Sequence, residues 1–389
     1  MTNPTRLICF CLLLSLCIGC RKTSGPTQSV AAPPAAPQAE LNHSGGGNAV
    51  ASETKYFKGS IGSSLDLQMK LVRSGDQLTG NYYYQKVGTK IELKGNVDKD
   101  GTLLLEEFDP SHKQTGVFKG LWITNAEDGL ITIAGNWSKP PGDKGGDKKT
   151  AFSIHEEPIV LTGGAEVITK QIKESNKKLM YEVEIQYPQL SGGSNPNFEK
   201  FNQAVRAAVT KKTVEFKKEI IAPEGEEPPP AGSMGSDLTV SYKVALVQDD
   251  LASINLAVGS YYQGAAHPNS YSEVINYDLK NGKLLRLADL FKSGAKYLPA
   301  ISAYCISDLS KQANAKGPDG MLDDNSIKNG AAPTPKNYQS WIITKRGLGI
   351  NFDAYQVGPY AAGPQYVLVP YSALKDLINP DGLVGQFAK

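Results

Sequence analysis

The chain has 389 residues, with 41 Lys and Arg against 39 Asp and Glu, so its formal net charge is +2. This balance lacks the dense basic field that a nucleic-acid or polyanion binder needs, and we expect no nucleic-acid partner. Hydrophobic residues make up 40% of the chain and charged residues 21%, which argues against wholesale disorder. The length predicts about two domains.

The first 20 residues have the features of a targeting segment. Arg6 precedes an apolar run from Leu7 to Gly19, which is shorter than the roughly 20 apolar residues that span a bilayer. The run ends at Gly19-Cys20, and a small residue before a cysteine resembles the lipobox of bacterial lipoproteins. We therefore predict a signal peptide at residues 1–19 and lipidation of Cys20. An ordinary secretory signal, cleaved elsewhere, is the alternative.

Lipidation would fix the location of the protein. Several acyl chains on one cysteine, palmitate among them, would anchor it stably in an envelope membrane, with the folded part in the periplasm or otherwise outside the cytoplasm. Arg21, and not Asp, follows Cys20, which favours the outer membrane if the cell is Gram-negative. Residues 20–52 are rich in Pro, Ala, Ser and Gly, and this composition predicts a flexible tether.

The cysteines and histidines indicate no disulfide and no metal site. Once residues 1–19 are removed, only Cys20 and Cys305 remain, so a lipidated Cys20 leaves Cys305 without a partner. Cys305 lies four residues from both Ile301 and Leu309, which predicts a buried, inert thiol on a helix. The four histidines show none of the spacings typical of zinc ligands. We predict no metal and no cofactor.

Residues 55–155 have the pattern of an all-β domain. Leu67 and Met69 alternate with polar residues, as in a half-buried strand. About eight such short strands follow one another, separated by turn signals such as Asp100-Gly101. This organisation predicts a small meandering barrel or sandwich. A closed barrel could carry a small apolar ligand, which is one alternative function.

Residues 165–386 mix helices and strands. Asn195 and Pro196 are typical of a helix start, and Phe198 and Phe201 begin an apolar face with helical spacing. Strands without regular helix alternation predict an α+β domain with a mainly antiparallel sheet. The expected strands are 179–187, 238–247, 253–262, 271–279, 342–352 and 365–370, and the further helices are 295–312 and 371–378. Residues 314–337 are rich in Gly, Pro and Asp and are expected to be mobile.

A series of motifs in this region resembles a known extracellular domain. The motifs are Tyr261 to Tyr271, Asn276 to Lys283, Leu287 to Phe291, Tyr355 to Pro364 and Val369 to Ser372. In this order they resemble the domain of unknown function shared by the lysozyme-sensing anti-sigma factor RsiV and the peptidoglycan deacetylase PdaC. The resemblance covers residues 165–386. Ala265 is a departure, because the family often has a second Gly there.

The resemblance implies a binding function and no catalysis. In RsiV-like proteins this domain faces the cell exterior and binds lysozyme. We find neither a sigma-binding segment nor a deacetylase domain in the sequence, so we expect no anti-sigma role and no enzymatic activity. We therefore expect the domain to bind a lysozyme-like protein or a cell-wall component such as peptidoglycan.

Aromatic residues within the motifs are the candidate contacts with a partner. Tyrosine offers a large, rigid contact area with a polar tip and is enriched at interfaces. His267 has two alternatives: a structural role in its own turn, or a hydrolase site with Asp278 or Asp289 as its partner. The predicted partner-binding residues are Tyr261, Tyr262, His267, Tyr271, Tyr355 and Tyr360.

Overall fold

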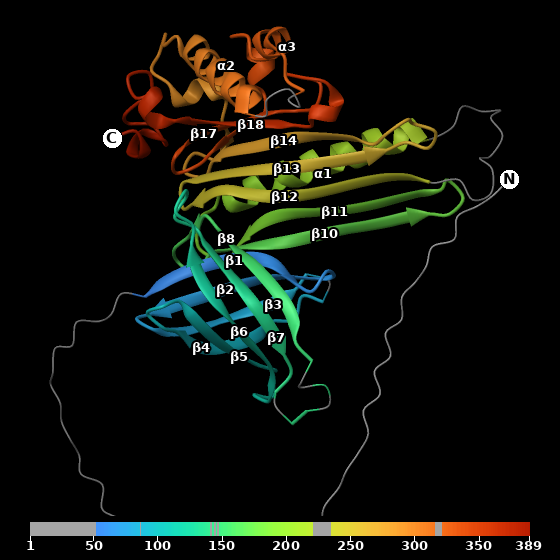
Figure 1. The fold of residues 1–389 in the computed structure, drawn as a ribbon, viewed down its shortest axis with the longest axis vertical. Coiled ribbons are helices and arrows are strands. Elements are labelled where there is room, and N and C mark those ends of the chain that lie inside the picture. Colours follow the sequence, from blue (N-terminus) through green and yellow to red (C-terminus); the bar gives the residue numbers. More distant parts are fainter. Residues whose placement is uncertain are drawn as a thin grey trace, which may run out of the picture. The chain divides into compact units, whose positions relative to one another are not determined.

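A computed structural model gives the fold of most of the chain after the N-terminal segment (Figure 1). The predicted signal peptide, the lipidation of Cys20 and nearly all of the predicted tether lie outside the described residues, so these remain predictions. Within the described part, every helix is too short or too polar to cross a bilayer. The described residues are 52–85, 87–140, 142–143, 145, 148–220, 235–315 and 321–389.

The first eight strands form a closed antiparallel barrel in simple up-and-down order. Closure is achieved by β1, which pairs with β2 on one side and with β8 on the other. The predicted all-β meander is thus confirmed, and the structure selects the barrel over the sandwich. The strands are β1 (Glu53–Ile61), β2 (Leu65–Ser74), β3 (Gln77–Tyr84), β4 (Ile91–Val97), β5 (Thr102–Phe108), β6 (Gln114–Thr124), β7 (Ile131–Ser138) and β8 (Thr150–Glu157).

Large side chains pack against one another in the barrel core. The period-two pattern turns Leu67 and Met69 inward, where both are buried. The Tyr82 and Phe118 rings meet edge to face with centroids 5.6 Å apart, and Phe118 meets Phe152 at 5.0 Å. This packing of buried rings disfavours the carrier alternative, because a carrier needs an interior left open for its ligand.

The chain continues into a seven-stranded sheet, which is mainly antiparallel. Its parallel pairs are β11 with β12 and β12 with β9. Helix α1 (Phe198–Ile220) lies along one face of the sheet (Figure 1). The predicted α+β class with a mainly antiparallel sheet is confirmed. The strands are β9 (Ile159–Val160), β10 (Glu166–Asn176), β11 (Tyr181–Ser191), β12 (Ser236–Gln248), β13 (Leu251–Tyr261), β14 (Asn269–Asp278) and β15 (Lys283–Leu284).

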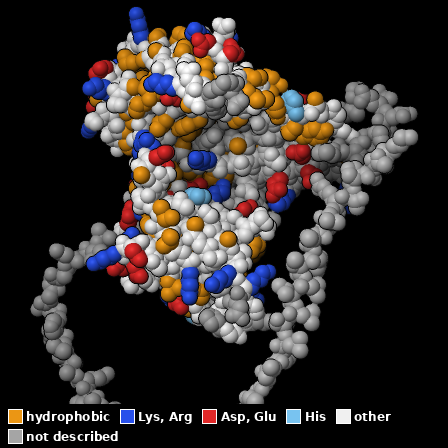
Figure 2. Space-filling view, viewed as in Figure 1, with side chains coloured by type: hydrophobic (Ala, Val, Ile, Leu, Met, Phe, Trp, Pro, Cys, Tyr) orange, Lys and Arg blue, Asp and Glu red, His pale blue; other side chains and the backbone are white. Residues whose placement is uncertain are grey.

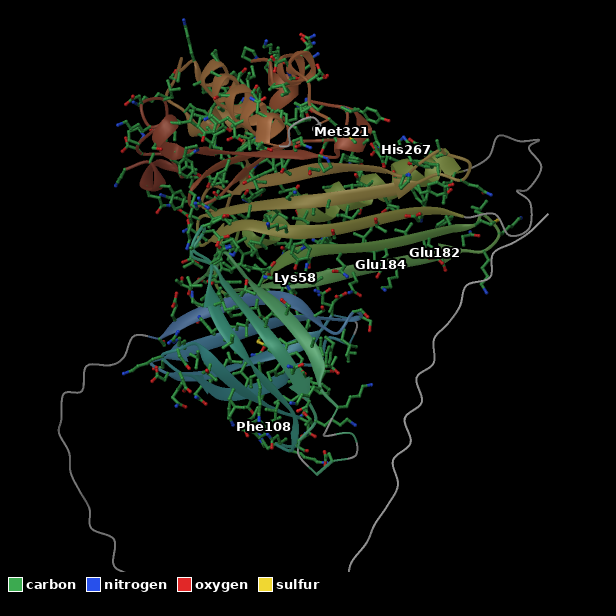
Figure 3. All side chains as sticks on the ribbon, in the orientation of Figure 1. Lys58, Phe108, Glu182, Glu184, His267 and Met321 are labelled. Carbon is green, nitrogen blue, oxygen red and sulfur yellow. The ribbon has the colours of Figure 1, made fainter. Side chains whose placement is uncertain are left out.

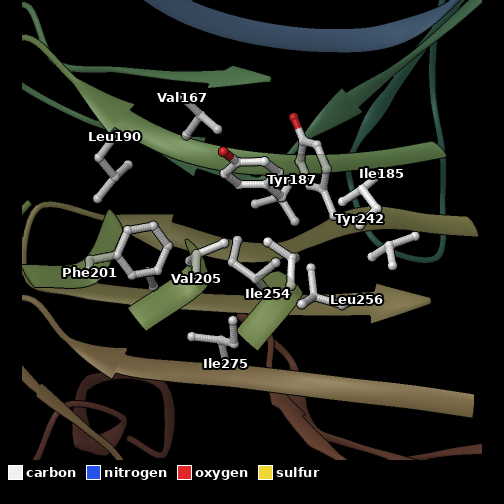
Figure 4. Packing of buried hydrophobic residues seen from close by; sticks show 14 of the residues in the cluster. Val167, Ile185, Tyr187, Leu190, Phe201, Val205, Tyr242, Ile254, Leu256 and Ile275 are labelled. Carbon is white, nitrogen blue, oxygen red and sulfur yellow. The ribbon is translucent and has the colours of Figure 1, made fainter. Parts of the chain in front are cut away.

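Helix α1 begins at Phe198, two residues after the predicted start, and buries its predicted face. The Asn195 side-chain oxygen accepts the backbone N–H of Asn197 at 2.9 Å, which forms a turn just before the helix. Phe201 and Val205 are fully buried, and Figure 4 shows them packed with Ile254 and Ile275 of the sheet. This apolar contact holds the helix against the sheet.

A second hydrophobic cluster lies under a three-stranded sheet and two helices. Cys305 is fully buried in it, and burial raises the pKa of its thiol to about 12. The predicted burial of Cys305 is therefore confirmed, and a buried thiol with a raised pKa is expected to be inert. The elements are η1 (Leu287–Leu290), α2 (Tyr297–Ala315), α3 (Asp324–Gly330), η3 (Pro335–Tyr338), β16 (Trp341–Ile343), β17 (Gly347–Phe352), η4 (Tyr360–Ala362), β18 (Gln365–Pro370), η5 (Tyr371–Ala373) and η6 (Gly385–Phe387).

A buried polar network joins the two sheets. Ser253 donates its hydroxyl to the Asn276 side-chain oxygen at 2.6 Å and accepts the backbone N–H of Ile343 at 2.8 Å. The Asn276 amide in turn donates to the carbonyl of Trp341 at 2.7 Å. Because each of these buried polar groups has a partner, the network fixes how β16 sits against β13 and β14.

Two predictions of local structure are wrong. The single strand predicted at 342–352 is a hairpin of β16 and β17, which pair antiparallel. The helix predicted at 371–378 is only the short η5 followed by turns, and its first hydrogen bond spans three residues, from Leu374 N–H to Tyr371. Helix α3, which was not predicted, starts because the Asp323 carboxylate accepts the backbone N–H groups of Asn325 and Ser326, both at 3.0 Å.

Candidate binding surface

Two loops of the C-terminal region meet at one edge of the sheets. The first joins β13 to β14 and carries His267, and the second joins β17 to β18 and carries Tyr355 and Tyr360. The second loop is held against β14, next to the first loop, by Asp353, whose carboxylate accepts the backbone N–H of Ser272 at 2.9 Å. Burial raises the pKa of the Asp353 carboxyl, although the hydrogen bond from Ser272 works in the opposite direction.

Three predicted contact residues form a compact group, which we call the aromatic surface: His267, Tyr355 and Tyr360. The His267 ring stacks on Tyr360 with centroids 4.0 Å apart, and the Tyr355 ring lies 5.5 Å from Tyr360. The Tyr360 hydroxyl donates to the carbonyl of Pro268 at 2.7 Å. Stacking and hydrogen bonding therefore fix the orientation of all three rings before any partner arrives.

A hydrogen bond holds the histidine ring in its loop. His267 Nδ1 lies 2.9 Å from the carbonyl oxygen of Pro268, and because a carbonyl only accepts, Nδ1 carries a hydrogen. The Tyr355 hydroxyl lies 3.4 Å from Nε2 on the other side of the ring. This arrangement supports the predicted structural role of His267 in its turn, while the ring stays exposed.

Tyr355 is held in a strained and exposed conformation. Its φ angle is +71°, in the left-handed region that side chains other than Gly rarely adopt, and 64% of its surface is exposed. The neighbouring Gln356 holds this backbone conformation, because its side-chain amide donates to the carbonyls of Gly330 at 3.1 Å and Asn337 at 2.9 Å. Strain of this kind persists only where neighbouring contacts impose it, and it is concentrated at functional sites.

Further apolar surface lies beside these loops. Met321 is 53% exposed, and Figure 3 places it on the same side of the domain as His267. The carbonyl of Met321 lies 3.5 Å from where a Cβ on Gly358 would stand, so it borders the second loop. Figure 2 shows hydrophobic side chains gathered around a histidine in this area. The aromatic surface is thus extended by a flexible thioether side chain, which can adapt to the shape of a partner.

The structure separates the remaining predicted tyrosines from this group. The Tyr262 ring lies 5.5 Å from Phe216 of α1, and the Tyr271 ring lies 5.3 Å from the ammonium group of Lys212. Both tyrosines pack partly buried against the α1 side of the sheet, where burial raises their pKa values. Tyr261 is half-buried at the end of β13. Tyr261 and Tyr271 lie in strands and Tyr262 directly follows β13, whereas the three residues of the aromatic surface lie in the two loops.

The two aspartates of the hydrolase alternative are used elsewhere. Asp278 accepts the backbone N–H of Asn281 at 2.9 Å and its side-chain amide at 2.7 Å, which closes a turn. Asp289 pairs with Arg286 at 2.8 Å. In the described part of the chain, no contact joins His267 to either carboxylate. Sequence reasoning missed Asp353 and Gln356, although both stand in or next to the Tyr355 to Pro364 motif.

Known proteins resemble parts of this chain. PdaC of Bacillus subtilis (strain 168), a peptidoglycan-N-acetylmuramic acid deacetylase, is 28% identical over 182 residues, which are 46% of this chain and 37% of PdaC. The immunogenic protein MPT64 of Mycobacterium tuberculosis is 29% identical over 115 residues, 30% of this chain and 47% of that protein. The chain thus spans less than half the length of either relative.

Solved structures and a family model add to these similarities. A crystal structure of a DUF3298 family member from Bacteroides fragilis has 18% sequence identity and a TM-score of 0.45, over 58% of this chain and 98% of that one. Another, from Pseudomonas aeruginosa PAO1, has 19% identity and a TM-score of 0.40, over 56% of this chain and 95% of that one. The model "Protein of unknown function (DUF3298)" matches residues 288–372, so the C-terminal region carries a DUF3298 domain.

Proposed function

We propose that this protein is a non-enzymatic lipoprotein of the bacterial cell envelope and that it binds an envelope protein through the aromatic surface. The observation that carries the proposal is the fixed, exposed ring of Tyr355 beside His267 and Tyr360. A lysozyme-like protein is the partner that we favour, because the motif series resembles the lysozyme-binding domain of RsiV-like proteins.

The geometry suits a protein partner for a physical reason. Binding costs free energy to immobilise side chains, about 0.5–1.5 kcal/mol for each flexible one. In this group the rings are already held by stacking and by the Pro268 carbonyl. Rigid tyrosines with a polar tip are typical centres of protein interfaces for this reason.

A cell-wall glycan is the second candidate. It is favoured by the similarity to PdaC, whose name assigns it peptidoglycan as a substrate. A deacetylase or hydrolase activity of this chain has weaker support, because Asp278 and Asp289 make other contacts. A carrier function has weaker support as well, since the barrel core is filled by packed rings.

A titration with the full chain tests the binding proposal. The Cys20→Ser variant, which cannot be acylated at that position, is titrated calorimetrically with hen egg-white lysozyme and is cosedimented with purified peptidoglycan. We expect Tyr355→Ala to weaken binding by about 30-fold or more, as for an interface hot spot. Tyr366→Ala is the matched control, because its ring is also exposed but lies outside the aromatic surface. Binding to neither ligand would refute the proposal.

The envelope location needs a separate experiment. Cells expressing the full chain are labelled with an alkyne analogue of palmitate, and we expect the label on the wild-type protein and none on Cys20→Ser. Both proteins are then followed through membrane fractionation. An unlabelled wild-type protein in the cytosolic fraction would contradict the lipoprotein proposal without affecting the binding proposal.

A further inference from the structure

A second concave site lies away from the aromatic surface. It is a cavity of about 590 Å³, a size within the range of small-molecule sites. The wall is formed by the middle of β12, by the hairpin of β16 and β17, by β18, and by the end of β8 with the residues before β7. Figure 2 shows Lys and Arg side chains and a histidine around a hollow in this part of the surface.

Much of the cavity wall is apolar. Its hydrophobic side chains come from five separate segments, so an apolar ligand body would have contacts on several sides. Tyr366 adds an aromatic ring that is 44% exposed. Burial of apolar ligand surface here would be favourable by about 25 cal/mol per Å² before the costs of binding are subtracted. The apolar lining residues are Leu130, Pro158, Val244, Ala245, Ile342 and Leu368.

Three exposed cationic side chains line the cavity, in addition to the half-buried Lys58, whose ammonium group lies over the Tyr242 ring. Lys243 stands on β12, and Lys345 and Arg346 occupy the turn between β16 and β17. All three are exposed, and among the described residues none of them forms an ion pair within 4.0 Å of a carboxylate. The cavity therefore presents positive charge that the described chain does not neutralise.

The carboxylates of the same cavity are already engaged. Glu156 accepts hydrogen bonds from Lys55 at 3.0 Å and from the backbone of Ile131 at 3.0 Å. Asp128 accepts the backbone N–H of Leu130 at 3.0 Å. Burial raises the pKa of the Glu157 carboxyl, although Lys58 and Gln68 work in the opposite direction. Asp128 forms no ion pair among the described residues, so one unpaired carboxylate lies among three unpaired cations and the net unpaired charge on the wall is positive.

One polar group adds hydrogen-bonding capacity. The side-chain oxygen of Asn255, a lining residue, is buried without a hydrogen-bond partner among the described residues. A buried acceptor without a partner costs roughly 1–3 kcal/mol. A donor group on a bound molecule could supply the missing bond.

We propose that this cavity binds a small organic anion with an apolar body. Lys345 and Arg346 hold the anionic group, Lys243 adds to the attraction, and the apolar wall between Val244 and Leu368 holds the body. The unpaired cations favour a negatively charged ligand, and the apolar lining favours an organic anion over a simple inorganic one.

The test uses a fluorescent probe of this chemistry, 8-anilinonaphthalene-1-sulfonate, with the full-length Cys20→Ser protein at neutral pH. We expect saturable enhancement of emission, and binding weakened by about tenfold or more when Lys345→Glu and Arg346→Glu are combined. Lys119→Glu with Lys375→Glu is the charge-matched control, because both lysines are exposed and lie outside the cavity lining. The control should bind the probe as the wild type does.

Two more measurements make the result decisive. The uncharged analogue N-phenyl-1-naphthylamine should bind at least about tenfold more weakly than the sulfonate, because it lacks the group that the cations attract. The variant Lys243→Gln, which removes charge without reversing it, should weaken sulfonate binding while circular dichroism stays unchanged. Absence of probe binding, equal binding by the charge-reversed variant, or equal binding of the uncharged analogue would overturn the proposal.

Discussion

Tyr355 allows the strain at the aromatic surface to be measured. Substitution by Ala removes the ring and leaves a side chain with a φ of +71°. Substitution by Gly removes the same ring and also relieves the backbone, because Gly adopts this region freely. A left-handed conformation costs a residue with a Cβ roughly 1–2 kcal/mol. The additional unfolded-state entropy of Gly offsets about 0.5–1 kcal/mol of this gain.

The comparison therefore predicts an inverted order of stability. Tyr355→Gly should have a free energy of unfolding about 0.5–1 kcal/mol higher than Tyr355→Ala, whereas Ala is normally the more stable of the two. Urea denaturation followed by fluorescence and circular dichroism measures the difference. Tyr366, within strand β18, is the control site, and there the Ala variant should have the higher free energy of unfolding. An Ala variant at position 355 as stable as the Gly variant would refute the idea that the loop stores strain.

Three further predictions follow from burial and close contact. Gly95→Ala should lower the free energy of unfolding by about 1–3 kcal/mol in urea denaturation, because its Cβ would stand 1.9 Å from the Leu104 carbonyl oxygen. Burial raises the pKa of Asp353 in the folded protein. The Asp353 carboxyl therefore contributes its full stability to the fold below the unfolded-state pKa of about 3.9, and this stability is lost as pH rises through the folded-state pKa. The melting temperature of the wild type should therefore fall more steeply than that of Asp353→Asn as pH rises between the two pKa values. Identical dependence of the melting temperature on pH in the two proteins would contradict the raised pKa of Asp353. Cys305 should react with a thiol reagent at pH 8 only after denaturation, because burial raises its pKa to about 12. Rapid labelling of Cys305 in the native Cys20→Ser protein, located by peptide mapping because Cys9, Cys11 and Cys17 are thiols as well, would show the burial to be wrong.

Local patterns predicted the parts of the fold where one face of an element is buried. The alternation at Leu67 and Met69 indicated a strand of the barrel, and Asn195 marked the start of α1. Strand β10 was not predicted, because both of its faces carry polar residues and it pairs only with β11 at the sheet edge. Helix α3 was missed because Asn and Gly within it favour irregular structure, and its position depends on burial of Ile327.

The sequence indicated which residues form the candidate site, but it did not indicate which of them lie together in space. The motif series singled out His267, Tyr355 and Tyr360 together with three tyrosines that the structure places elsewhere. Contact between the two loops depends on Asp353 bonding to the backbone of Ser272, 81 residues apart in sequence. A single sequence contains no local signal for such a pairing, since neither residue belongs to a repeating pattern.

The cationic end of the cavity and the aromatic surface lie at opposite ends of the same strand. Strand β17 starts after the Lys345-Arg346 turn of the cavity and ends just before Asp353, which begins the loop of the aromatic surface. Its six residues separate that turn from Asp353 by roughly 20 Å. Substitutions at such a distance, without shared partners, are expected to add within about 0.3–0.5 kcal/mol. Combining Tyr355→Ala with the charge reversal at the cavity should therefore reproduce the sum of the two separate effects on each binding equilibrium. A larger discrepancy would mean that β17 couples the sites, so that a ligand in the cavity alters how tightly the aromatic surface holds its partner.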